Sequence, residues 1–150
     1  MIREFGLYLA IRLLGKLVVE KGVKMAELIH PELSYKIVGV LYKVYNELGG
    51  GYQEKVYQAA VRRELLNNKL GFIEQVKIDL FYDGNKIHRY YLDFIIEHKI
   101  VLELKVTPRF TPRDVTQVLS YLKQSGLSLG ILASLNRNEI LFKRILKGKS

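Results

Sequence analysis

Two carboxylates and a lysine stand on neighbouring stretches that otherwise read as apolar β-strands. Residues 90–105 read Y-Y-L-D-F-I-I-E-H-K-I-V-L-E-L-K, where two apolar runs flank a polar tip at 97–99, as in a tight β-hairpin. Since strand side chains alternate between faces, Glu103 and Lys105 share one face of the second run, and Asp93 can lie across from them. A lone buried carboxylate is costly, so the trio predicts either a bound cation or mutual ion pairing.

The trio also has a plain structural interpretation. Glu103 and Lys105 fit the exposed positions of an amphipathic strand, and Glu-x-Lys is a short motif that arises by chance in many chains. Another copy stands at Glu97 to Lys99, at the predicted hairpin tip, where water solvates it. Spacing alone therefore leaves an active site and a structural charge pair both open.

Composition limits the partners and the metal sites. The chain has 150 residues, of which 49% are hydrophobic, which predicts one globular domain. Its 24 basic and 15 acidic residues give a net charge of +9, which favours polyanions, nucleic acid first and anionic membrane second. There is no cysteine, and the three histidines show no paired spacing, so a metal would have to be held by carboxylates. Such a site indicates Mg²⁺ or Mn²⁺.

Residues 1–24 are apolar and basic, but Arg12 and Lys16 interrupt any membrane-length run, so we expect no transmembrane segment. A secretory signal fits poorly, because no small-residue cleavage site follows the short apolar core. We therefore expect a cytoplasmic protein with an amphipathic N-terminal extension over 1–24 and a domain over 25–150 that begins near Met25.

Helical periodicity predicts a helix that begins at Ser34 as its N-cap and ends at the glycines 49–51, and a second over 53–68. Glu54 lies in the first turn of the second helix, where the helix dipole by itself favours an anion. Alternating patterns and turn signals predict the remaining elements: strands over 76–82, 86–96 and 100–104, a helix over 112–124 capped by Thr111, and strands over 127–134 and 139–146, the last at a sheet edge.

This order of elements and charged residues resembles the PD-(D/E)xK nuclease superfamily, and within it the small GxxExxY family, whose name is matched by G-Y-Q-E-K-V-Y at 51–57. The resemblance covers about residues 30–146. It implies an α/β (α+β) restriction-endonuclease-like core, α-β-β-β-α-β with a mixed central sheet, behind the N-terminal helical extension. One departure is Leu92, which stands where the family name has proline before Asp93.

The resemblance also implies roles for individual residues. Asp93, Glu103 and the backbone carbonyl of Leu104 would hold Mg²⁺ or Mn²⁺, and Glu54 would reach the metal through water or support a second ion. Lys105 would orient the attacking water or stabilise developing charge on the phosphate.

Two further sets of residues complete the expected site. Gln117 and Tyr121 look like the Gln-x-x-x-Tyr pair of RecB-type nucleases, which borders the site, although an ordinary helix surface explains them as well. Arg62, Arg109 and Arg113 are the expected nucleic-acid contacts, and they predict salt-sensitive, largely sequence-independent binding.

The resulting prediction is a metal-dependent nuclease, an Mg²⁺- or Mn²⁺-dependent phosphodiesterase that acts on DNA, with RNA as the less favoured substrate. One alternative is a catalytically silent module of the same fold that binds nucleic acid or a protein. Another is an endonuclease like the Holliday-junction resolvases, which makes a homodimer a reasonable expectation. Retention of Asp93, Glu103 and Lys105 favours the enzyme, because a pure binder of phosphate has no need of carboxylates.

Overall fold

A computed structural model describes residues 29–148. The chain divides into two compact units, Met1–Gly49 and Gly50–Ser150. The proposed extension over 1–24 and the domain start at Met25 lie outside the described residues. Nowhere in the described part is a helix both long enough and apolar enough to cross a bilayer.

In the first unit, the described residues form one helix, α2 (Pro31–Leu48). The prediction that it begins at Ser34 is wrong. The helix begins three residues earlier, after His30, which adopts a left-handed conformation with φ of 48°. Proline suits a first helical position, because its φ is already helical and its missing N–H would have had no partner there. Gly49 ends the helix as expected.

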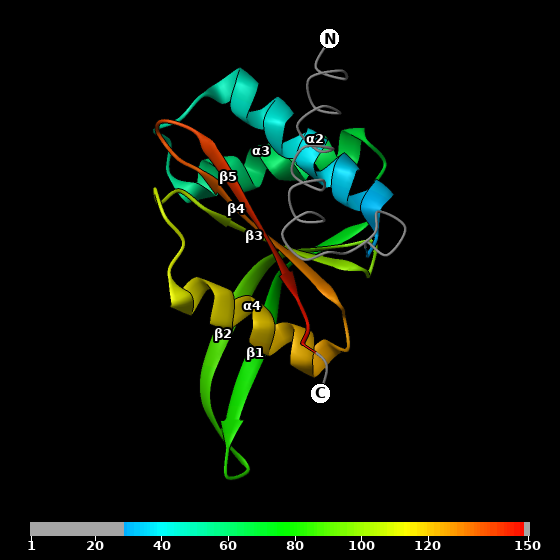
Figure 1. Ribbon diagram of the computed structural model, residues 1–150, viewed down its shortest axis with the longest axis vertical. Helices are drawn as coiled ribbons and strands as arrows, with labels where there is room; N and C mark the ends of the chain where they lie inside the picture. The colour runs from blue at the N-terminus through cyan, green and yellow to red at the C-terminus, as the bar shows by residue number, and fades with distance from the viewer. Residues whose placement is uncertain (1–28, 149–150) are drawn as a thin grey trace. The chain divides into compact units, whose positions relative to one another are not determined.

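The second unit is a five-stranded sheet with helices, shown in Figure 1. Its strand order is β1-β2-β3-β4-β5, with β3 and β4 parallel and every other pair antiparallel. This confirms the expected mixed sheet, and every predicted strand and helix of this unit is present. The elements are α3 (Glu54–Asn67), β1 (Phe72–Tyr82), β2 (Asn85–Ile96), β3 (Ile100–Lys105), α4 (Pro112–Ser125), β4 (Leu129–Leu135) and β5 (Ile140–Leu146).

The helix α4 connects the two parallel strands and packs on one face of the sheet. Val118 and Leu122 of α4 lie in a core cluster with Val101 of β3 and Leu132 of β4. Gly130 pairs with Val101, and a Cβ atom built on Gly130 would stand 2.4 Å from Cγ1 of Val118. The helix can therefore approach β4 this closely only because position 130 has no side chain.

We expect Gly130→Ala to lower the free energy of unfolding by about 1–3 kcal/mol, the usual cost of forcing an extra methyl group into a packed core. Urea denaturation of the two proteins measures this. Adding Val118→Ala removes the clashing Cγ1 atom, so the double variant should be less destabilised than the sum of the two single substitutions. Additive losses would contradict the contact.

The strand β2 changes its side-chain alternation at Asp93. Leu92 and Ile95 both pack in the core cluster under α4, although residues three apart in a regular strand point to opposite faces. On the neighbouring strand, Gln75 lies opposite this point with a φ of 52°. The pairing of β2 with β3 covers only 94–96 on β2. Asp93 therefore lies at a local irregularity, where its side chain can turn toward the end of β3.

Candidate active site

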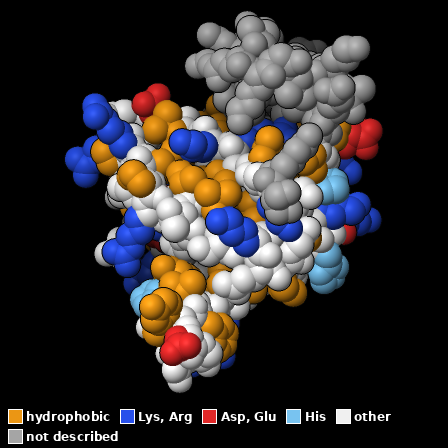
Figure 2. Space-filling view, turned by 60° about the horizontal axis from the view of Figure 1, so that its bottom comes forward, with side chains coloured by type: hydrophobic (Ala, Val, Ile, Leu, Met, Phe, Trp, Pro, Cys, Tyr) orange, Lys and Arg blue, Asp and Glu red, His pale blue; other side chains and the backbone are white. Residues whose placement is uncertain are grey.

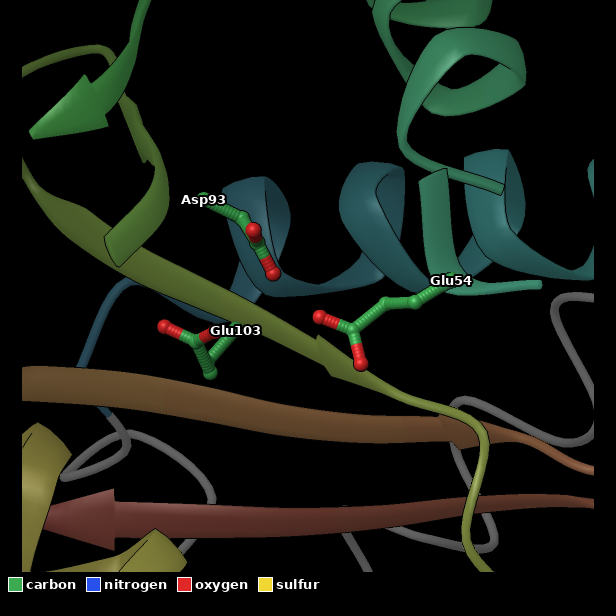
Figure 3. A group of neighbouring side chains, drawn as sticks. All are labelled: Glu54, Asp93 and Glu103. Atoms are coloured by element: carbon green, nitrogen blue, oxygen red, sulfur yellow. The ribbon is translucent and has the colours of Figure 1, made fainter. Parts of the chain in front are cut away.

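Three carboxylates from three separate elements meet at the end of β3. Glu54 comes from the first turn of α3, Asp93 from β2 and Glu103 from β3. One oxygen atom of each lies within 4.8 Å of the others, and Figure 3 shows the three carboxylates around a common space. Asp93 and Glu103 are each only 3% exposed, whereas Glu54 is half-buried. The structure thus brings together the three acids that the sequence analysis proposed.

Both oxygen atoms of Asp93 accept hydrogen bonds. The backbone N–H of Leu104 donates to Oδ2 at 2.7 Å, and Nε2 of Gln58 donates to Oδ1 at 2.6 Å. The same amide nitrogen lies 3.3 Å from Oε1 of Glu54. Gln58 therefore links two of the three carboxylates.

Gln58 is a site residue that was not predicted from the sequence. The available signal was its position four residues after Glu54, which places both side chains on one face of α3.

Glu103 is the most strongly perturbed acid of the three. Burial, and then the negative charge of Asp93, raise the pKa of Glu103 to about 10. Burial also raises the pKa of Asp93, against the opposing effect of the Leu104 N–H, and burial with the charge of Asp93 raises the pKa of Glu54. Oε2 of Glu103 is buried, and within the described residues no N–H or hydroxyl group donates to it, although the carboxyl groups of Glu103 and Asp93 can share a proton. Such a cluster holds a proton at neutral pH unless a cation neutralises it.

Lys105 stands at the edge of this cluster and is held by the start of α4. Its Nζ atom lies 3.5 Å from Oδ1 of Asp114, and its side chain remains partly exposed. Asp114 is itself fixed by a capping box, in which its carboxylate accepts the N–H of Thr111 at 2.8 Å and its own N–H donates to the Thr111 hydroxyl at 3.3 Å. The ammonium group therefore has a defined position.

Gln117 and Tyr121 have observed partners outside the carboxylate cluster. Nε2 of Gln117 lies 3.4 Å from the carbonyl oxygen of Tyr91, two residues before Asp93. Tyr121 packs against the core cluster under α4, where burial raises the pKa of its phenol. Their predicted role beside the site stays a prediction.

The three arginines proposed for nucleic-acid binding differ in their surroundings. Arg62 forms an ion pair with Glu74, with 2.6 Å between Nε and Oε2. Arg109 and Arg113 are exposed on the segment that leads from β3 into α4. Arg109 and Arg113 are thus accessible to a phosphate, whereas the charge of Arg62 is already balanced in part by Glu74.

The motif over 51–57 supports the loop before Glu54. Gly51 has a φ of 102°, which a residue with a side chain rarely adopts. The buried ring of Tyr57 packs edge-on against Tyr52 at 6.0 Å, and its hydroxyl oxygen accepts the N–H of Tyr52 at 3.4 Å. Glycine and tyrosine therefore fix the loop that presents the acid between them.

Comparison with known proteins agrees with this architecture. A search of curated proteins found no match. Among solved structures, "Crystal structure of SSO0001" is similar with a TM-score of 0.51 and 19% sequence identity, over 81% of this chain and 60% of that chain. The present chain thus spans less than two thirds of that one, and the likeness supports the restriction-endonuclease-like fold.

A family model described as the PD-(D/E)XK nuclease superfamily matches residues 31–145. Nucleases of this superfamily use divalent metals, in agreement with the observed cluster of carboxylates. The assignment to the GxxExxY family stays a prediction. The chain belongs to the PD-(D/E)XK nuclease superfamily.

Proposed function

We propose that this protein is a metal-dependent nuclease that hydrolyses the phosphodiester bonds of DNA. The observation that carries the proposal is the convergence of Glu54, Asp93 and Glu103 within 4.8 Å, with Lys105 on the strand that bears Glu103. Lys105 offsets part of the charge of the three acids, but it is also ion-paired to Asp114, and the pKa values of all three acids remain raised. A divalent cation would supply the remaining counter-charge.

The donor set fits Mg²⁺ or Mn²⁺, which prefer oxygen ligands. Asp93, Glu103 and the backbone carbonyl of Leu104 would hold the ion, with Glu54 directly or through water. The Oε2 atom of Glu103, to which no N–H or hydroxyl group of the described residues donates, supports this assignment, because a buried carboxylate oxygen without such a donor is costly unless a cation or a shared proton satisfies it. When bound, the cation lowers the pKa of a water molecule and polarises the phosphate.

The remaining groups would position the reactants. Lys105 would donate a hydrogen bond that orients the attacking water or stabilises charge on the phosphoryl oxygens. Gln117 and Tyr121 would border the substrate. Arg109 and Arg113 are the proposed phosphate contacts beside the site, and Arg62 would be a further contact that shares its charge with Glu74. Each contact should contribute to a binding affinity that falls as salt rises.

Gln58 should matter for metal affinity although it is not a ligand. Gln58→Leu removes the amide that orients Glu54 and Asp93, so we expect Mg²⁺ or Mn²⁺ to bind about 10–100-fold more weakly. Isothermal titration calorimetry with the metal alone measures this. Arg63→Gln, at an exposed position on the same helix, is the matched control. Tighter metal binding by the Leu variant would mean that Gln58 competes with the ion.

Incubation of linear duplex, circular single-stranded and branched DNA, and of RNA, with Mg²⁺ or Mn²⁺ tests the proposed function. Cleavage that needs metal and disappears in Asp93→Ala, with folding retained, supports the nuclease. Preference for branched DNA would favour a resolvase-like endonuclease, and light scattering would show whether that species is a homodimer. Binding of nucleic acid without cleavage in either metal would favour the non-cleaving module.

A further inference from the structure

The β1–β2 hairpin continues beyond the part of the sheet that α4 covers. Figure 1 shows the two strands running past α4 to a free turn. Ile78 and Tyr90 still pack on the core cluster under α4, and Nε2 of Gln124 on α4 lies 3.2 Å from the carbonyl oxygen of Asp79. Residues 80–88, here called the arm, extend beyond these contacts.

The arm exposes large apolar side chains, and Figure 2 shows hydrophobic side chains around the projecting tip of the molecule. Phe81, Tyr82 and Ile87 are 61%, 73% and 58% exposed, and they lie within seven consecutive positions around the turn. Scattered exposed apolar residues are common, but a group of this kind on a projecting element marks a binding surface. The sheet itself does not require the group, because the apolar contacts of the hairpin with α4 come from residues nearer its base.

The charges around the arm favour a nucleic acid as its partner. Over residues 77–89, Lys77 and Lys86 are exposed against the exposed carboxylate of Asp83 at the turn, and the Asp79 carboxylate is bound by Arg89 at 2.6 and 3.1 Å, which leaves a small positive excess. The whole chain carries a net charge of +9, which repels a second copy and attracts a polyanion. Aromatic rings beside lysines suit a nucleic acid, since rings stack on bases or sugars and lysines contact phosphates.

We infer that the arm is a second nucleic-acid contact that binds the substrate at a distance from the bond that is cut. The inference rests on the proposed function. The strand β2 joins the arm directly to the site, with Asn85 at the turn and Asp93 in the carboxylate cluster, eight residues later. At roughly 3.3 Å per residue the separation is about 26 Å, or about seven to eight nucleotides of a duplex.

Fluorescence anisotropy in EDTA, so that no cleavage occurs, tests the arm on duplexes of about 5 and about 24 base pairs, one shorter and one much longer than the separation of site and arm. The shorter duplex is closed by a hairpin loop so that it stays paired. The wild-type protein should bind the longer duplex more tightly. The double variant Phe81→Ser and Tyr82→Ser should lose about tenfold or more of its affinity for the longer duplex, and little for the shorter one. Ile73→Ser is the control, since Ile73 is 47% exposed on the same strand outside the arm.

The inference would be overturned if the wild-type protein bound both duplexes with equal affinity. It would also be overturned if the double variant bound the longer duplex as tightly as the wild-type protein does. A dimer by light scattering that becomes monomeric in the double variant would overturn it too, because the arm would then bind a second copy. Failure of the proposed function looks different. In that case the wild-type protein would cleave no nucleic acid in the presence of metal. A length-dependent loss of binding in the double variant would still support the arm as a nucleic-acid contact.

Discussion

Lys105→Met is expected to slow DNA cleavage by about 10²–10³-fold while leaving metal affinity nearly unchanged. Methionine keeps the length of the side chain and removes the ammonium group, so the variant loses the charge and hydrogen bonds offered to water and phosphate. The backbone around Leu104, whose N–H holds Asp93, is untouched. The ion pair with Asp114 is also lost, but the Thr111 capping box still fixes Asp114 at the start of α4.

Single-turnover cleavage and calorimetric titration with Mn²⁺ separate the two effects. Lys99→Met is the matched control, because Lys99 is exposed in the turn that precedes the same strand. If Lys105 only stabilised the fold through Asp114, Lys105→Met would melt at a lower temperature than the wild-type protein. Asp114→Asn would then reduce cleavage as strongly as Lys105→Met does. Full activity in a folded Lys105→Met protein would remove the lysine from the proposed chemistry.

The elements of the second unit could be predicted because their signals are local. Asp83 and Gly84 mark one hairpin turn, and Thr111 with Pro112 and Asp114 marks the start of α4. Each signal acts within a few residues of the chain, where capping and turn geometry are decided. The predicted start at Ser34 was wrong because serine is a common N-cap, whereas the helix begins earlier, at Pro31.

The features that could not be predicted depend on contacts between distant segments. Gln58 and Asp93 are 35 positions apart, and no sequence pattern near either residue predicts their hydrogen bond. The ion pair of Arg62 with Glu74 likewise needs the helix and the strand to be in place. The irregularity at Asp93 lies opposite Gln75, where no glycine or proline marks it in the sequence. The proximity of Asp93 and Glu103 could be proposed from the alternation of side chains in the hairpin, whereas the arrival of Glu54 from a separate helix could be proposed only from the family resemblance.

The most decisive variant for the carboxylate cluster is Glu103→Gln. At high pH we expect it to be more stable than the wild-type protein without metal, and less stable than the wild-type protein with metal. In EDTA, folded wild-type protein holds a proton on Glu103 with a pKa of about 10, whereas the unfolded chain releases it near the ordinary value of 4.5. The folded state therefore binds more protons between these values, so wild-type stability falls as pH rises through that window. Glutamine has no proton to lose, so the variant should be the more stable protein at pH 9, with little difference near pH 4.5.

Saturating Mg²⁺ should invert this order. A cation that binds only the folded state stabilises it by RT ln(1 + [L]/Kd), which is about 2.7 kcal/mol at one hundred times Kd. The variant lacks one carboxylate ligand, so it should lose most of this stabilisation. Urea denaturation at pH 5, 7 and 9, in EDTA or Mg²⁺, measures both effects. Glu139→Gln, at an exposed position, should show neither. If Glu103 were instead a structural partner of Lys105, the variant would be less stable than wild type in EDTA at every pH, and Mg²⁺ would stabilise the two proteins equally.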